Sequence, residues 1–194
     1  MISAVVICLN EEKLIEQCIS NLLWTDEIVV IDGGSVDKTL VLLKKMKDEG
    51  IVRLYKKPFD GHFGDQKNLG ISLANGDWVF VFDADEIMEP ELSDELKSIA
   101  VEKNQYDAVA IPRKNFTNGI PVDPYPDLQF RFFRNYCRYL YAFHEELIGY
   151  RRLYTAKNHI LHYKSQERYN LQQERYRRLK SSHKSKLRLP HEDW

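Results

Sequence analysis

Residues 78–86 read Trp78-Val79-Phe80-Val81-Phe82-Asp83-Ala84-Asp85-Glu86, an apolar run that ends on a cluster of acids. A continuous apolar run of this length predicts a β-strand that is buried on both faces. Strands of that kind belong to parallel sheets, because crossover helices cover both faces of such a sheet. The stretch therefore predicts an α/β fold with an acidic turn at the end of one central strand.

The residues before it repeat the same alternation of strand and helix. Apolar runs predict strands over 3–9, 27–31 and 51–55, and helical spacing of apolar residues predicts helices over 14–23, 39–46, 64–74 and, after the acidic turn, 91–100. Alternating strands and helices form right-handed βαβ units. We therefore expect a mostly parallel central sheet that is flanked by helices.

Polar turns follow three of these strands. They are Leu9-Asn10-Glu11-Glu12, Asp32-Gly33-Gly34-Ser35 and Asp83-Ala84-Asp85-Glu86. Ligands of open α/β sheets bind beyond the carboxyl ends of the strands. Because parallel strands end at the same edge of the sheet, we expect the three turns to meet there and to form one ligand site.

The acidic turn has the chemistry of a metal site. Asp83 and Asp85 are two residues apart, so their carboxylates can point to the same side, and Glu86 adds a third negative charge. Carboxylates this close raise one another's pKa unless a cation lies between them. A divalent ion such as Mn²⁺ or Mg²⁺ resolves that conflict and can also bridge a diphosphate. The alternative is a solvated acidic loop at the start of the next helix.

The turn after the second strand suits a nucleoside. Asp32 stands at the strand end, and Gly33 and Gly34 let a ligand approach the backbone, which fits recognition of a base or ribose. The alternative is an ordinary turn in which Ser35 or Asp37 caps the following helix. The turn lacks the Gly-x-Gly-x-x-Gly pattern, which argues against a dinucleotide redox cofactor.

The second half of the chain follows a different pattern. Residues 109–112, 128–133 and 139–141 predict mixed or antiparallel strands, with Pro121, Pro124 and Pro126 in a connecting loop, and 165–182 predicts a polar C-terminal helix. We expect one domain over 1–194, in which residues 1–105 bind the nucleotide, 106–164 face the second substrate and 165–194 form a basic helical tail.

Composition narrows the classes of partner. The chain has 194 residues, 43% of them hydrophobic and 29% charged, with a net charge of −1, which suits one compact domain and gives no reason to expect nucleic-acid binding. The basic segment 164–188 can contact an anionic membrane, although a solvated helix face explains it as well. Three cysteines without Cys-x-x-Cys spacing predict buried thiols. We expect no signal peptide and a cytoplasmic protein, with peripheral contact at the inner face of a membrane.

Four segments together resemble one known family. They are 6–12, 30–39, 66–68 and 77–86, and both their order and their spacing match family-2 glycosyltransferases of GT-A fold. The chain is most similar to the lipopolysaccharide-core glucosyltransferase-like branch, in which Asp-Ala-Asp-Glu and a later His-Glu are typical. The resemblance is strong over residues 2–90 and weaker beyond them. One departure is Asn68-Leu69-Gly70 where Asn-x-Ala is more usual, and we expect only a small change in packing.

The resemblance implies a role for each matching residue. The nucleotide and the donor sugar would contact Leu9, Asn10, Glu12, Asp32, Gln66, Lys67, Asn68, Asp83 and Ala84. Asp32 would reach the uracil or ribose, and Asp83 the ribose and donor sugar. Asp85 would hold the metal on the diphosphate. For Lys67 an exposed first helical turn is the alternative.

The second half supplies the remaining candidates. An acceptor hydroxyl must lose a proton as it attacks the anomeric carbon, and a carboxylate is the usual base. Glu145 in His144-Glu145-Glu146 matches the family's His-Glu; Glu146 leaves the register open, and a surface carboxylate pair is the alternative. His144 would orient the base or bind the donor. His162 is a candidate metal ligand or a structural histidine.

Together these features predict an inverting, metal-dependent glycosyltransferase. It would transfer a hexose, glucose by resemblance, from a UDP-sugar such as UDP-glucose to a glycan or glycolipid, with Mn²⁺ or Mg²⁺ as cofactor. A sugar-phosphate nucleotidyltransferase would need a Gly-rich basic loop after the first strand, where Glu11 and Glu12 stand instead. An inactive nucleotide-sugar-binding module is a further alternative, but the intact acids argue against it.

Overall fold

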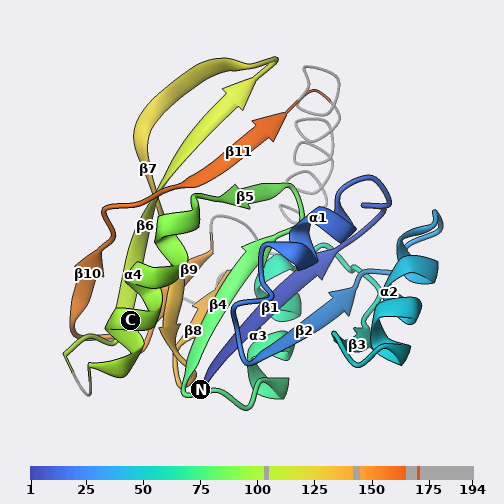
Figure 1. The fold of residues 1–194 in the computed structure, drawn as a ribbon, viewed down its shortest axis with the longest axis horizontal. Coiled ribbons are helices and arrows are strands. Elements are labelled where there is room, and N and C mark those ends of the chain that lie inside the picture. Colours follow the sequence, from blue (N-terminus) through green and yellow to red (C-terminus); the bar gives the residue numbers. More distant parts are fainter. Residues whose placement is uncertain (103–104, 142–144, 165–169, 171–194) are drawn as a thin grey trace, which may run out of the picture.

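A computed structural model describes residues 1–102, 105–141, 145–164 and 170 (Figure 1). Helices cover a central sheet from both sides, and the strands of the second half continue that sheet. The elements in chain order are β1 Ile2–Cys8, α1 Ile15–Ser20, β2 Glu27–Asp32, α2 Thr39–Asp48, β3 Arg53–Lys56, α3 Phe63–Leu73, β4 Trp78–Asp83, β5 Glu86–Met88, α4 Pro90–Val101, β6 Ala108–Thr117, β7 Ile120–Arg134, β8 Arg138–Leu140, β9 Glu146–Ile148, β10 Leu153–Thr155 and β11 Ile160–Lys164.

The sheet is parallel in its first half and mixed in its second. The described residues form a nine-stranded sheet of order β3-β2-β1-β4-β7-β6-β11-β5, with β10 beside β6, and a two-stranded sheet of β8 and β9. The pairs among β1 to β4 are parallel, whereas β7 is antiparallel to both β4 and β6. The predicted α/β class is thus confirmed. Both halves of the chain contribute to one sheet, and their division near residue 105 stays a prediction.

The central strands are buried on both faces, as their continuous apolar runs predict. In β1, Ala4 and Val6 pack in one core with α1, α2 and α4, while Val5 packs in a second core with Ile71 of α3. All three strand residues are fully buried. Successive side chains of a strand point to opposite faces. One run of apolar residues therefore fills two cores, which explains why no polar alternation marks these strands.

The prediction that Pro121, Pro124 and Pro126 lie in a connecting loop is wrong. These residues lie inside β7, which pairs with β6 over most of its length and projects with it beyond the helices (Figure 1). Among the described strands, β4 contacts only the last residues of β7, 132–134. Before residue 132, the edge of β7 that faces away from β6 has no described strand beside it. A proline there therefore removes no hydrogen bond to a second strand.

The C-terminal segment lies mostly outside the residues that the structure describes. The helix predicted over 165–182 lies outside the described residues apart from Asn170, and so does most of the basic segment 164–188. Among the described helices, none is both long enough and apolar enough to span a bilayer. Cys8, Cys18 and Cys137 are free and buried, which confirms the expectation for the thiols.

Gly70 determines how closely α3 packs on the sheet. A Cβ atom at this position would lie 2.3 Å from Cγ1 of Val5 and 3.4 Å from Cγ1 of Ile31. The departure from Asn-x-Ala is therefore larger than the small packing change expected, because Val5 occupies the space that an alanine methyl group would need.

We predict that Gly70→Ala destabilises the protein even though alanine favours helix. Overpacking costs about 1–3 kcal/mol, which exceeds the gain of about 1 kcal/mol in helix propensity. Urea unfolding of Gly70→Ala, Val5→Ala and the double variant measures the coupling. The double variant should lose less stability than the two single losses added together. Additive losses would show that the contact with Val5 does not set the spacing. Ser72→Ala, at an exposed position of α3, is the control.

Candidate active site

The three polar turns meet at one edge of the sheet, as predicted. In the strand register, Cys8 of β1 lies beside Asp32 of β2, and Ile7 lies beside Asp83 of β4. Neighbouring strands are about 4.8 Å apart, so Asp32 and Asp83 flank the end of β1 from its two sides. The edge therefore gathers the turns after β1, β2 and β4 into one region.

Hydrogen bonds fasten the first two turns to each other. The backbone N–H of Asn10 donates to Oγ of Ser35 at 3.0 Å, and Oδ1 of Asn10 accepts from the N–H of Val36 at 2.8 Å. Oε2 of Glu12 accepts from the N–H of Lys38 at 3.0 Å. Asn10 and Glu12 thus shape this edge through their own side chains. Contacts of Leu9, Asn10 and Glu12 with a nucleobase stay predictions.

Asp32 holds the turn that follows it. Its side chain is fully buried, and its carboxylate accepts the N–H groups of Gly34 at 3.0 Å and Ser35 at 3.2 Å. Gly33 is needed here because a Cβ atom would lie 3.1 Å from the carbonyl oxygen of Cys8 and 3.3 Å from Cβ of Leu9. Asp32 therefore anchors its own turn, and direct contact of Asp32 with the nucleoside stays a prediction. Of the two residues that the capping alternative names, Asp37 accepts the N–H of Thr39, the first residue of α2, at 3.0 Å, whereas Oγ of Ser35 accepts the N–H of Asn10.

The first turns of α3 tie the two halves together. Gln66 and Lys67 are buried, so the alternative of an exposed helical turn is wrong for Lys67. Nε2 of Gln66 donates to the carbonyl oxygen of Lys57 at 2.8 Å. The amide of Asn68 donates to the carbonyl oxygen of Tyr139 and accepts the N–H of the same residue, at 2.8 and 2.9 Å.

Lys67 pairs with the candidate base. Its Nζ lies 2.9 Å from Oε1 of Glu145, and the side chain of Glu145 is only 17% exposed. Gly64 allows this arrangement, because a Cβ there would lie 2.5 Å from the carbonyl oxygen of Tyr141, on the segment that leads to Glu145. Glu146 is exposed and begins β9. Glu145 is therefore the better placed of the two carboxylates, and His144 lies outside the described residues.

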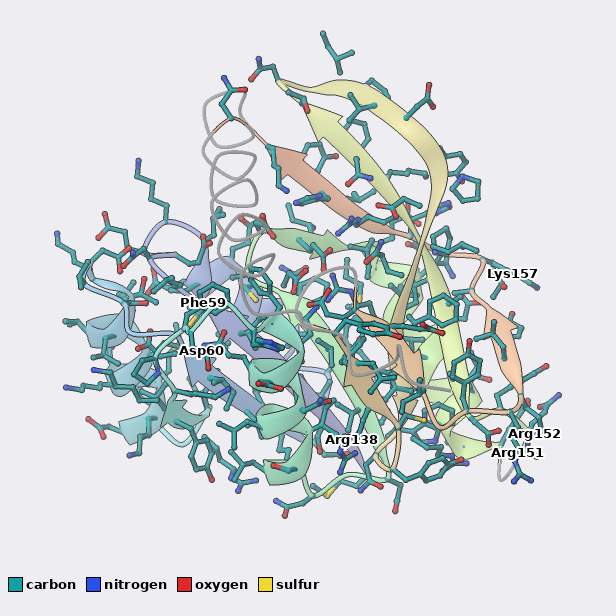
Figure 2. All side chains as sticks on the ribbon, turned by 180° about the vertical axis from the view of Figure 1, so that it is seen from behind. Phe59, Asp60, Arg138, Arg151, Arg152 and Lys157 are labelled. Carbon is teal, nitrogen blue, oxygen red and sulfur yellow. The ribbon has the colours of Figure 1, made fainter. Side chains whose placement is uncertain are left out.

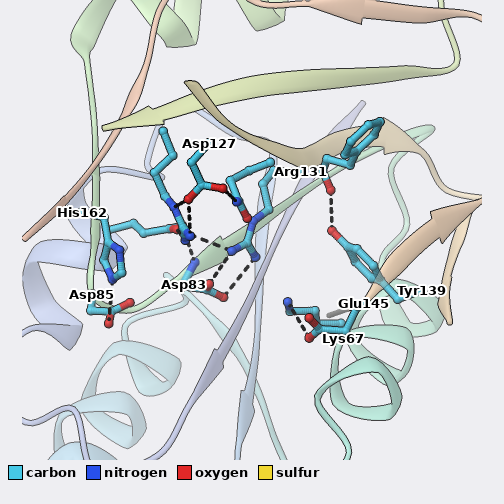
Figure 3. A network of polar contacts seen from close by, with 12 residues as sticks. Lys67, Asp83, Asp85, Asp127, Arg131, Tyr139, Glu145 and His162 are labelled. Atoms are coloured by element: carbon cyan, nitrogen blue, oxygen red, sulfur yellow. Dashed lines mark hydrogen bonds and ion pairs between the residues drawn. The ribbon is translucent and has the colours of Figure 1, made fainter. Parts of the chain in front are cut away.

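Two arginines of the second half neutralise the acidic turn (Figure 3). The guanidinium of Arg131, on β7, donates to both carboxylate oxygens of Asp83 and lies 3.4 Å from Oε1 of Glu86. Nη1 of Arg113, on β6, donates to the same glutamate oxygen at 2.8 Å. Glu86 is buried, as is Ala84 beside it. Sequence reasoning missed both arginines, although Arg131 interrupts the apolar run Phe130-Arg131-Phe132-Phe133 and so marks a buried charge that needs a partner.

These cations change the electrostatic argument for a metal. Burial alone would raise the pKa of Asp83, but the charges of Arg131 and then Lys67 outweigh burial and hold this pKa well below its usual range. The repulsion that we expected a divalent ion to relieve is therefore relieved at Asp83 and Glu86 by cations of the protein itself. Asp85 is the acid of this turn that remains as the candidate metal ligand.

Asp85 faces His162 across the end of the sheet. Oδ2 of Asp85 lies 3.2 Å from Nε2 of His162, which is buried on β11. Burial would raise the pKa of Asp85, and the hydrogen bond and charge of His162 lower it below its usual value. Among the described residues, no group of three or more acidic, histidine or cysteine side chains is arranged around a metal. The carboxylate of Asp85 nevertheless suits Mn²⁺ or Mg²⁺, and Nε2 of His162 would be the second protein ligand of such an ion.

Two exposed arginines of the second half, Arg151 and Arg152, lie elsewhere. Figure 2 shows them on the other side of the molecule from Phe59 and Asp60. The latter pair belongs to the loop before α3, where the N–H of Phe59 donates to the carbonyl oxygen of Gly33 at 2.9 Å. Near the acidic turn, the described positive charges include the buried Lys67 and Arg131 and the half-buried Arg113.

The glycosyl transferase family 2 model matches residues 3–167. The chain belongs to this family. It is 32% identical to the lipopolysaccharide core biosynthesis glycosyltransferase LpsC of Rhizobium meliloti (strain 1021) over 124 residues, 63% of this chain and 46% of that protein. It is 36% identical to the uncharacterized glycosyltransferase RC0292 of Rickettsia conorii (strain ATCC VR-613 / Malish 7) over 105 residues, 54% of this chain and 36% of that protein. The chain thus spans between about a third and a half of the length of these curated relatives.

Solved structures support the fold of this family-2 chain. S. aureus TarS 1-349 in complex with UDP has a TM-score of 0.65 at 19% identity, over 87% of this chain and 62% of that one. The mannosyltransferase PcManGT from Pyrobaculum calidifontis, in complex with GDP-Man and Mn²⁺, has a TM-score of 0.50 at 22% identity, over 58% and 35% of the two chains. At these identities the likeness concerns the fold, which confirms the GT-A-like architecture.

We predict that Arg131→Met strongly destabilises this family-2 domain. Removing one partner of a buried ion pair leaves the carboxylate of Asp83 without its arginine, which costs about 3–5 kcal/mol, whereas Glu86 keeps its contact with Arg113. Urea unfolding should show this loss, and adding Asp83→Asn should restore part of it, because the charge that lost its partner is then removed. Lys45→Met, which breaks the exposed pair with Glu49, should change little. A loss as small as that of the control would contradict the compensating role of Arg131.

Proposed function

We propose that this chain is the catalytic domain of an inverting, metal-dependent glycosyltransferase that uses a UDP-hexose. The observation that carries the proposal is the arrangement at one sheet edge of Asp85 with His162, Asp83 with Arg131, and Glu145 with Lys67. These pairs supply a metal site, a fixed carboxylate and a base. A donor sugar requires all three on the same side of the sheet.

A nucleotide sugar is the donor class that the relatives support. TarS was solved with UDP and with UDP-GlcNAc, and PcManGT with GDP-Man and Mn²⁺. We assign UDP-glucose or a related UDP-hexose to this chain through its resemblance to the lipopolysaccharide-core branch. The acceptor is a glycan or glycolipid, in line with the name of the relative LpsC, and we place it at the cytoplasmic face of a membrane.

The two aspartates have different tasks. Asp85 and His162 would hold the divalent ion, which would supply positive charge to the leaving diphosphate. Asp83 remains on Arg131, so its carboxylate is held in one position and can accept hydrogen bonds from hydroxyl groups of the ribose and the donor sugar. A carboxylate that is already paired with an arginine has less need of a metal. We therefore assign Asp83 to the donor sugar and Asp85 to the metal ion.

Glu145 acts as the base in a single displacement. It takes the proton of the acceptor hydroxyl while the oxygen of that hydroxyl forms a bond to the anomeric carbon. The bond from that carbon to the diphosphate breaks, UDP leaves with the electron pair, and the anomeric configuration inverts. Lys67 fixes the carboxylate of Glu145 from α3, and its ammonium group also lies 5.1 Å from the ring centre of Tyr139.

We predict that Asp85→Asn removes the metal-dependent part of UDP binding. In the wild type at saturating UDP, adding Mn²⁺ at a hundredfold excess over its Kd for the UDP complex should raise the free energy of unfolding by about 2.7 kcal/mol. In Asp85→Asn the two conditions should give the same melting temperature in a thermal-shift assay. Asp77→Asn, at an exposed acid near the N-terminus, is the matched control. If Asp85→Asn kept the full effect of Mn²⁺, the metal role of Asp85 would be refuted.

We predict that Glu145→Gln lowers turnover by about 10²–10⁴-fold, the usual contribution of a general base. Release of UDP from UDP-glucose measures turnover, and the Kd for UDP should stay within a factor of about two because the glutamine amide keeps a contact with Lys67. The neighbouring Glu146→Gln should retain wild-type turnover. The reverse outcome, a slow Glu146→Gln and a normal Glu145→Gln, would move the base by one residue.

A further inference from the structure

His162 contacts a second polar residue on the side away from Asp85. Its Nδ1 lies 2.8 Å from Oδ1 of Asn115, and the two residues are neighbours in the register of β11 and β6. On the other side of β11, His162 lies beside Glu86 of β5. The imidazole is thus held between two strands, with one ring nitrogen toward Asn115 and the other toward Asp85.

The orientation of the Asn115 amide follows from its other partner. Nδ2 of Asn115 donates to Oδ2 of Asp127 at 2.9 Å. The same carboxylate oxygen accepts Nε and Nη2 of Arg113 at 2.9 and 2.7 Å. A carboxylate paired with a guanidinium is ionised and can only accept, so the NH₂ group of Asn115 must face it. The amide oxygen of Asn115 therefore faces His162.

This orientation sets the protons on the imidazole. An amide oxygen accepts hydrogen bonds, so Nδ1 of His162 must carry a hydrogen and donate it to Asn115. The other nitrogen, Nε2, lies 3.2 Å from Oδ2 of Asp85. A proton on Nε2 can join these two atoms, and a divalent ion that displaced this proton would be bound by the same oxygen and nitrogen.

We infer that Asn115 is a positioning residue that presents Nε2 of His162 to a divalent metal ion. The inference rests on the proposed function, which makes Asp85 and His162 the metal pair. Asp127 and Arg113 fix the Asn115 amide, and Asn115 fixes the histidine tautomer. An acceptor for the other ring N–H of a metal-binding histidine sets the ring orientation, and its loss costs about 10–100-fold in metal affinity.

The same arginine serves both parts of the site. Arg113 donates to Asp127 through Nε and Nη2 and to Glu86 through Nη1. One guanidinium thus connects the hydrogen bonds that run from Asp127 through Asn115 to His162 with the acidic turn. A purely structural histidine could accept or donate at Nδ1 equally well. Here the carboxylate of Asp127 excludes one of the two amide orientations, and this constraint is specific to the tautomer that a metal requires.

The test measures Mn²⁺ binding by electron paramagnetic resonance in the presence of saturating UDP. Asn115→Leu should raise the Kd for Mn²⁺ by about 10–100-fold relative to the wild type. Asn158→Leu is the matched control: its amide donates to Oε2 of Glu95 at 2.8 Å, in a similar contact at the far end of β11, and its Kd should equal that of the wild type.

A second readout needs no variant of Asn115. With UDP and diamagnetic Mg²⁺ bound, nitrogen-15 spectra of the histidine side chains, with His162 assigned from a His162→Gln sample, should show hydrogen on Nδ1 and none on Nε2. Hydrogen on Nε2 in that complex would overturn the inference, even if Asn115→Leu failed to fold. Equal Mn²⁺ affinity in folded Asn115→Leu and wild type would also overturn it while leaving the proposed metal site intact. A wild type that binds no Mn²⁺ with UDP would refute the proposed metal pair, and the inference with it.

Discussion

The ion pair between Asp83 and Arg131 joins the two halves of the sheet at the place where the site forms. Asp83 ends β4 in the parallel half, and Arg131 belongs to β7, which crosses that end in the antiparallel direction. A charge as buried as Arg131 is stable only with partners, and it has Asp83 and Glu86. The acidic turn and the second half of the sheet therefore depend on each other.

This constraint divides the Asp-Ala-Asp-Glu turn into two parts. Asp83 and Glu86 are compensated by arginines, whereas Asp85 points to a histidine. Mutual repulsion among three acids is therefore no argument for a metal here. Within the turn, the proposed metal site concerns one carboxylate, that of Asp85, whose Oδ2 lies 3.2 Å from Nε2 of His162.

The parallel half of the fold was predictable because its signals are local. Apolar runs, helical spacing and the turns at strand ends all lie within about ten residues of each other, and the rule that ligands bind at carboxyl ends selected the correct edge. The roles of Asp32 and Lys67 were harder to foresee. Burial decided both, because Asp32 turns inward to its own loop and Lys67 reaches Glu145, 78 positions along the chain.

The second half resisted prediction for a physical reason. Which residue of β7 faces Asp83 depends on the register between β4 and β7. Apolar periodicity fixes the face on which a side chain lies, but shifts of two residues keep that face, so it does not name the neighbour in a distant strand. The prolines of β7 misled for the same reason, since only the sheet order shows that they lie on an unshared edge. An arginine inside an apolar run was the one available signal. It indicates a buried ion pair but does not name the partner.

The most direct test of the different roles of Asp83 and Asp85 is a crystal structure with UDP and Mn²⁺, in which anomalous scattering locates the metal. Our account predicts one manganese peak bound by Asp85 and Nε2 of His162, with Asp83 still paired to Arg131. A peak bound by Asp83 with Arg131 displaced from it would contradict the account, and so would a manganese ion that contacts neither Asp85 nor His162.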